Sequence, residues 1–112
     1  QALVQLCMGV PWGAPDDLNT FIAMVNNVPD DWTFSAFSLG RNQMAYVAAA
    51  VLAGGNVRVG LEDNLWLEKG VLAENYQLVE RAKTIIENMG ARVMGPAALR
   101  EKLGLIKRAP RG

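Results

Sequence analysis

The 112-residue chain contains no histidine and a single cysteine, Cys7. With one cysteine no internal disulfide can form, which favours a reduced, cytoplasmic protein. A catalytic thiol usually works beside a histidine base, so this composition argues against a cysteine-histidine pair. Because Cys7 lies inside an apolar run, we expect it to be a small, inert core residue.

Net charge and long apolar runs are also lacking. Eleven acidic and eleven basic residues balance, so no overall field attracts nucleic acid or an acidic membrane. No run approaches the roughly eighteen apolar residues that span a bilayer. We expect no membrane partner and no nucleic-acid partner. The basic ending LIKRAPRG (residues 105–112) is interpreted as solvated, with nucleic-acid binding as the lesser alternative.

Apolar residues, in contrast, make up 51% of the chain, which indicates a folded domain. Short apolar runs predict three strands, at residues 2–10, 33–39 and 56–61. Helical spacing predicts helices within residues 16–29, 40–55 and 74–90, and a last short helix that opens with Pro96. The stripe expected to be buried in the second helix comprises Met44, Val47, Ala48, Val51 and Leu52.

Strands that alternate with helices predict parallel pairing with right-handed crossovers. We expect the strands to be adjacent in sequence order, with their helices on one side. An open doubly wound sheet and a segment of a (β/α)8 TIM barrel both fit this pattern. Three strands alone leave two open edges, and a barrel needs about 250 residues. Residues 1–112 are therefore interpreted as the C-terminal part of one barrel domain, roughly its last three βα units.

In either architecture the functional site lies at the C-terminal ends of the strands. Along the third strand, Arg58 and Glu62 fall on one face, with Gly60 between them leaving room for a ligand or for a close approach of the backbone. Glu62 can bind a metal or a proton, and Asp63, where the strand ends, can turn inward as a general base. The alternative is structural: the two acids cap the next segment and form local ion pairs.

The segment VRVGLEDN (residues 57–64), with the ending GPAALREKLGL, closely resembles the β-keto acid cleavage enzymes, typified by 3-keto-5-aminohexanoate cleavage. The resemblance extends upstream through LGRNQMAYVAAAVLAGG and, more weakly, to MGVPWGAP. It implies a zinc-dependent (β/α)8 barrel that reacts a small β-keto acid with acetyl-CoA to give acetoacetate and a new CoA thioester.

The resemblance also implies roles for individual residues. Glu62 matches the carboxylate ligand of Zn²⁺, Asp63 the catalytic acid-base residue, and Arg58 the arginine that assists it. Zinc would act as a Lewis acid on the ketone. The two histidine ligands of the family have no counterpart here, because the chain contains no histidine. These 112 residues therefore cannot complete a zinc site alone, and the remainder of the barrel is an expected partner.

Cofactor contacts are expected from the strand-end loops. Gly40 and Arg41 would contact substrate or CoA phosphates, together with Asn64 after the third strand; alternatively, Arg41 is a helix-start residue bonded locally. Exposed tryptophans and the resemblance suggest a homo-oligomer. Two other functions stay open: another metal-dependent aldolase or lyase on the same fold, or a non-catalytic α/β binding or assembly module.

Overall fold

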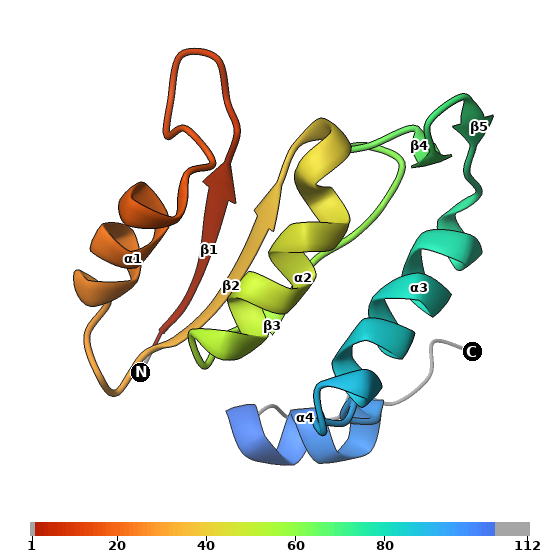
Figure 1. Cartoon of the computed structure of the whole chain (residues 1–112). Coiled ribbons are helices and arrows are strands. Elements are labelled where there is room, and N and C mark those ends of the chain that lie inside the picture. The colour runs from red at the N-terminus through yellow and green to blue at the C-terminus, as the bar shows by residue number, and fades with distance from the viewer. Residues whose placement is uncertain (1, 105–112) are drawn as a thin grey trace, which may run out of the picture.

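The structure, a computed structural model, describes residues 2–104. The basic ending discussed above lies outside the described residues. The first half of the chain alternates strands and helices (Figure 1). Its elements are β1 (Leu3–Met8), α1 (Leu18–Asn26), β2 (Thr33–Ser38), the 3-10 helix η1 (Gly40–Asn42), α2 (Gln43–Leu52) and β3 (Asn56–Val57).

The second half begins with a feature that the sequence analysis missed. Strands β4 (Trp66–Glu68) and β5 (Val71–Leu72) form a small antiparallel hairpin. Gly70, with φ +80°, adopts the left-handed backbone conformation that this tight connection needs. Helices α3 (Asn75–Asn88) and α4 (Pro96–Leu103) follow, and α4 carries Pro96 in its first turn as predicted.

The three N-terminal strands form a parallel sheet in the order β1-β2-β3, which confirms the predicted pairing. Leu3 pairs with Thr33, and Ser35 pairs with Asn56. The third strand is much shorter than predicted. Pairing stops at Val57, and residues 58–60 continue without strand pairing before a turn at residues 61–63. Because strand pairing ends at Val57, the chain is able to turn at residues 61–63, which carry the two acids of the candidate site.

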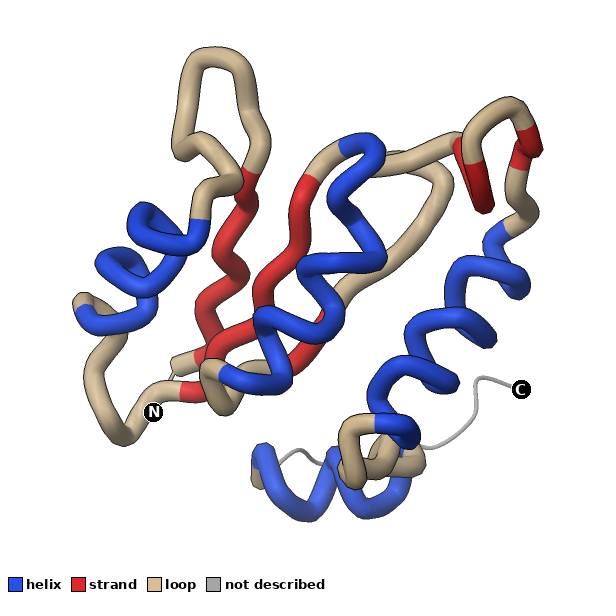
Figure 2. Tube along the Cα trace, viewed as in Figure 1, coloured by secondary structure: helices blue, strands red, loops and turns tan. Residues whose placement is uncertain are grey.

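Helices α1 and α2 cover the same face of this sheet, as predicted (Figure 2). Alternate strand residues such as Met8 and Ala36 point into a core that also receives Phe21 of α1 and Tyr46 of α2. The rings of Phe21 and Tyr46 meet edge to face, with centroids 5.3 Å apart. Gly55 is required beside this core, because a Cβ there would overlap the ring of Phe34.

The buried stripe of α2 differs from the predicted one. Gln43, Tyr46, Val47 and Ala50 are buried, whereas Leu52 is 82% exposed. The sheet accepts Tyr46 and the small Ala50, while Met44 and Val51 lie to the side and pack toward α3. Helix α2 is apolar on several sides, so spacing alone did not indicate which side faces the sheet.

Helix α3 packs against α2 through Ala82 and Ile86, which surround Val47. Its N-terminus has a capping box: the Glu74 side chain accepts from the backbone of Gln77, whose side chain in turn accepts from the backbone N–H of Glu74. Among residues 2–104, no helix combines the length and apolar character needed to cross a membrane.

Candidate functional site

The face of the sheet that α1 and α2 do not cover, here called the open face, carries Gln5, Cys7, Ser35, Phe37 and Arg58. Gln5 and Ser35 are register partners, and Ser35 Oγ donates to Gln5 Oε1 at 3.3 Å. Cys7 pairs in register with Phe37. Cys7, expected to be a core residue, is partly buried on this face and lies outside the core that α1 and α2 cover. Burial, followed by the charge of Asp63, raises the pKa of its thiol, which favours the neutral form.

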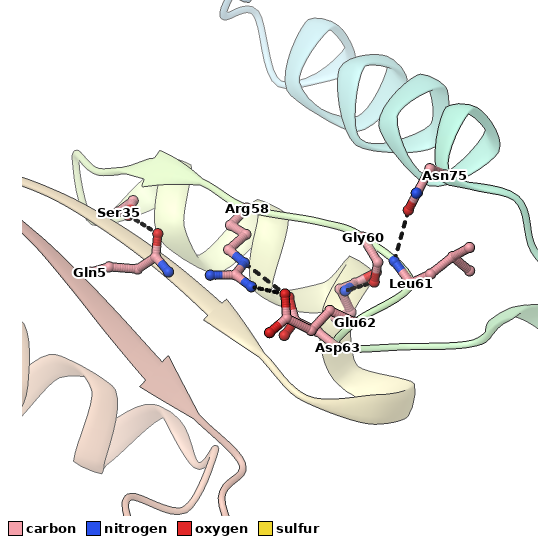
Figure 3. A network of polar contacts seen from close by, with 9 residues as sticks. Gln5, Ser35, Arg58, Gly60, Leu61, Glu62, Asp63 and Asn75 are labelled. Atoms are coloured by element: carbon pink, nitrogen blue, oxygen red, sulfur yellow. Dashed lines mark hydrogen bonds and ion pairs between the residues drawn. The ribbon is translucent and has the colours of Figure 1, made fainter.

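Arg58 is the centre of the polar network on the open face (Figure 3). Its Nε donates to Asp63 Oδ2 at 3.1 Å, and its Nη2 donates to Glu62 Oε2 at 3.1 Å. Its guanidinium carbon lies 4.6 Å from the centroid of the buried Phe37 ring. A charge-assisted fork above an aromatic ring holds the side chain in one orientation.

The turn at residues 61–63 explains how Asp63 reaches Arg58. In a continued strand Asp63 would start on the opposite face from Arg58. Instead the chain turns after Gly60, whose carbonyl accepts from the backbone N–H of Asp63 and of Asn64. Gln43 Nε2 also donates to this carbonyl, and Asn75 Oδ1 accepts from the N–H of Leu61. Contacts from α2 and α3 therefore set the position of the Asp63 carboxylate.

Glu62 and Asp63 differ in burial although both bind Arg58. The side chain of Asp63 is 5% exposed, and that of Glu62 is 83% exposed. Asp63 is thus a shielded, oriented carboxylate, whereas Glu62 is open to solvent and to any ligand. The structural alternative also expected local ion pairs, so the two interpretations are distinguished by measuring activity and stability on the same variants.

The residues present do not make a zinc centre. Within the described part of the chain, no three histidine, cysteine or acidic side chains gather as metal ligands would, and a catalytic zinc ion commonly takes three protein ligands. Glu62 can offer one accessible carboxylate. The predicted zinc ligand is therefore accessible, but residues 2–104 provide no companion ligands for it.

The three residues expected to contact the cofactor have different environments. The N–H of Gly40 donates to the carbonyl of Asp63 at 2.7 Å, so it joins the loops after β2 and β3. The Asn64 amide is held by both backbone groups of Trp66, at 2.7 and 3.1 Å. Arg41 is exposed. Of the three predicted contacts, only Arg41 presents its side chain to solvent.

Asp16 is the first residue of the range predicted to contain a helix (16–29), but in the structure it joins the first two strand-end loops. Its Oδ2 accepts from Asn42 Nδ2 at 2.5 Å and from the buried Ser38 Oγ at 3.0 Å. The Asn42 bond is the main reason that the pKa of Asp16 is lowered, and the charge of Arg41 contributes. The adjacent Asp17 caps α1.

The fold and the site together define a class of protein. It is an α/β protein with a parallel sheet, and beyond the C-terminal ends of the strands an arginine holds a carboxylate. The loops after β2 and β3 are hydrogen-bonded to each other at this site. The chain belongs to the beta-keto acid cleavage enzyme family, whose model matches residues 1–105. That match agrees with the resemblance found in the sequence.

Individual relatives support this placement. A 3-dehydrocarnitine:acetyl-CoA trimethylamine transferase of Rhizobium meliloti (strain 1021) is 73% identical over 106 residues, which cover 95% of this chain and 35% of the relative. A 3-keto-5-aminohexanoate cleavage enzyme of Acetoanaerobium sticklandii is 38% identical over 101 residues, 89% of this chain and 37% of the relative. A 3,5-dioxohexanoate:acetyl-CoA acetone transferase of Paraburkholderia graminis is 41% identical over 76 residues, 67% of this chain and 24% of the relative. The chain thus spans about a third or less of the length of these relatives.

Proposed function

We propose that the complete protein containing this chain cleaves a β-keto acid in a reaction with acetyl-CoA, giving acetoacetate and a new acyl-CoA. The observation that carries this proposal is the Arg58 fork, which orients a shielded Asp63 at the strand ends of a chain that belongs to this family. Because an R. meliloti relative acts on 3-dehydrocarnitine, that keto acid is the first substrate to test.

Asp63 is the residue proposed to move a proton. Arg58 binds its Oδ2, which leaves Oδ1 as the oxygen that can face a substrate. A carboxylate shielded from solvent exchanges its proton with a bound reactant more selectively than an exposed one. Arg58 is proposed to fix the orientation of Asp63 and to stabilise its negative charge.

The proposal extends to the architecture. The three parallel strands would be the last three βα units of a (β/α)8 barrel, with the open face toward its interior. Support comes from the polar lining of that face, which places Gln5, Ser35 and Arg58 together (Figure 3). Zn²⁺ is proposed as the metal, with Glu62 as one ligand and the others from the remainder of the barrel. A cytoplasmic homo-oligomer is also proposed.

The test is a screen of the complete polypeptide against a panel of β-keto acids that includes 3-dehydrocarnitine. Acetoacetate and the new CoA thioester are measured by mass spectrometry, with and without acetyl-CoA, and metal content is determined on the same sample. Formation of both products only when acetyl-CoA is present supports the proposal. Cleavage without acetyl-CoA would indicate an aldolase or lyase, and a folded protein without turnover would indicate the binding or assembly module.

A further inference from the structure

The loop after β1 presents a tryptophan on a folded support. Gly9 and Val10 both donate through their backbone N–H to the carbonyl of Ala14, at 2.9 and 3.2 Å, and Gly13 donates to the carbonyl of Val10 at 3.0 Å. These bonds close residues 9–14 into a compact loop with Trp12 near its tip, 89% exposed. Figure 1 shows this loop projecting beyond the ends of the strands.

Both ends of the loop are held by contacts with the rest of the fold. Asp16 is held by Ser38 and Asn42, and Tyr46 Oη donates to the backbone carbonyl of Asp16 at 2.5 Å. At the other end, Gly9 has φ +75°, and a Cβ there would lie 2.8 Å from Ser38 Oγ. The loop is therefore seated against β2, so Trp12 is held out toward solvent at little further cost in conformational entropy.

Three groups follow one another along the C-terminal edge of the sheet. Asp63 lies after β3, the exposed Arg41 after β2, and Trp12 after β1. The carbonyl of Asp63 is bonded to the N–H of Gly40, just after β2, and neighbouring strands are about 4.8 Å apart, so the loop after β1 begins about 10 Å from Asp63. Three further residues, at about 3.3 Å each, can raise the loop tip by up to another 10 Å.

This separation is too large for a small keto acid that reacts beside Asp63, but it suits acetyl-CoA. In that molecule the thioester, the pantetheine arm, the phosphates and the adenine follow in a fixed linear order. With the thioester near Asp63 and the phosphates near the Arg41 guanidinium, the adenine falls in the direction of Trp12. Aromatic side chains on a rigid support are effective platforms for a nucleobase.

We propose that Trp12 binds the adenine base of acetyl-CoA by stacking, on a loop that the Asp16 bonds to Ser38 and Asn42 hold in place. This inference rests on the proposed function, because it takes acetyl-CoA as the second substrate. It assigns Trp12 a role in binding the nucleotide end, and none in the chemical step.

The test compares CoA with pantetheine, which lacks the nucleotide, as ligands of the complete protein in titration calorimetry. Stacking is lost in Trp12→Ala and largely kept in Trp12→Phe. Trp32→Ala is the control. Trp32 is also exposed (40%), but it directly precedes β2 and so lies at the N-terminal end of the strands, away from the proposed site. We expect Trp12→Ala to raise the Kd for CoA about fivefold or more and to leave the Kd for pantetheine unchanged. Trp12→Phe should recover most of the CoA affinity, and Trp32→Ala should match the parent.

The outcomes separate this inference from the proposed function. A parent protein that binds CoA with the predicted Trp12 dependence but cleaves no keto acid would leave the inference standing and overturn the function. An active enzyme whose CoA affinity is unaffected by Trp12→Ala would do the reverse. If Trp12→Ala instead lowers the oligomer mass with CoA affinity unchanged, the tryptophan is a subunit contact and the inference is wrong. Equal weakening of CoA and pantetheine, or a parent that binds neither, also overturns it.

Discussion

Replacing Arg58 with lysine keeps the positive charge but removes the planar fork. In the structure Nε and Nη2 bind different carboxylates, each at 3.1 Å, while the guanidinium lies over Phe37. An ammonium group is a point charge and cannot reproduce this arrangement. Asp63, only 5% exposed, would lose its orienting partner, whereas Glu62, at 83% exposed, would rehydrate at little cost.

The size of the effect follows from these contacts. A hydrogen bond to a charged group is worth about 1.5–3 kcal/mol, an exposed ion pair about 0–1 kcal/mol, and an arginine above an aromatic ring about 0.5–1 kcal/mol. Lysine retains part of the attraction to Asp63. We therefore expect Arg58→Lys to lower the free energy of unfolding of the complete protein by about 1–2 kcal/mol. That corresponds to a fall in Tm of roughly 2–6 °C.

Catalysis should suffer more than this stability change implies. A displaced Asp63 carboxylate is expected to reduce kcat/KM by roughly 10- to 100-fold, because small errors in the position of a reacting group are costly. The assay combines thermal unfolding with steady-state cleavage kinetics in the presence of acetyl-CoA.

Arg81→Lys is the matched control for this experiment. Arg81 is as exposed as Arg58, at 35% against 34%. It also joins two partners, the carbonyl of Leu67 at 2.7 Å and Glu68 at 3.2 Å. We expect Arg81→Lys to lower Tm by a similar amount without changing kcat/KM. If both variants lose the same stability and neither loses activity, Arg58 is structural and the reasoning is refuted.

Three further predictions concern metal binding, pH and the isolated chain. Glu62→Gln should leave the Tm of the metal-free protein almost unchanged, because its carboxylate is exposed, yet lose Zn²⁺, the stability that Zn²⁺ adds and activity together in metal analysis, thermal unfolding and kinetics; retained zinc would remove Glu62 from the ligand set. Because hydrogen bonding lowers the pKa of Asp16 from 3.8, its stabilising contribution is full above that pH and is lost as the pH falls through the lowered value; Asp16→Asn should therefore flatten this part of a Tm-against-pH curve, and an unchanged acid limb would contradict it. Expressed alone, the 112-residue chain should self-associate and retain no zinc, since both sheet edges are open, and a monomer in light scattering with stoichiometric zinc would be the opposite result.

Much of the fold could be predicted because it depends on local pattern. The apolar runs around Met8 and Ala36 and the helical spacing of α3 predicted elements that the structure contains, and alternation predicted parallel pairing. The hairpin of β4 and β5 was missed because its strands have three and two residues, too few to show a period. The sequence feature that could have indicated the hairpin was Gly70, a residue suited to the tight turn between the two strands.

The site was predicted less completely, because its geometry depends on tertiary contacts. Motif resemblance indicated Arg58, Glu62 and Asp63, and the structure brings all three together. The turn that points Asp63 at Arg58 is held by Gln43 and Asn75, which are distant in sequence. Asp16 was likewise indistinguishable from a helix-start acid until Asn42 and Ser38 were placed beside it.

The central claim is that Asp63 moves a proton while Arg58 orients it, and turnover of Asp63→Asn in the complete enzyme tests it most directly. The amide keeps the shape of the side chain and can still meet Arg58 through its oxygen, but it cannot take up a proton. With zinc content unchanged, turnover should fall by about 10² to 10⁴. A fully active Asp63→Asn enzyme would contradict the assignment.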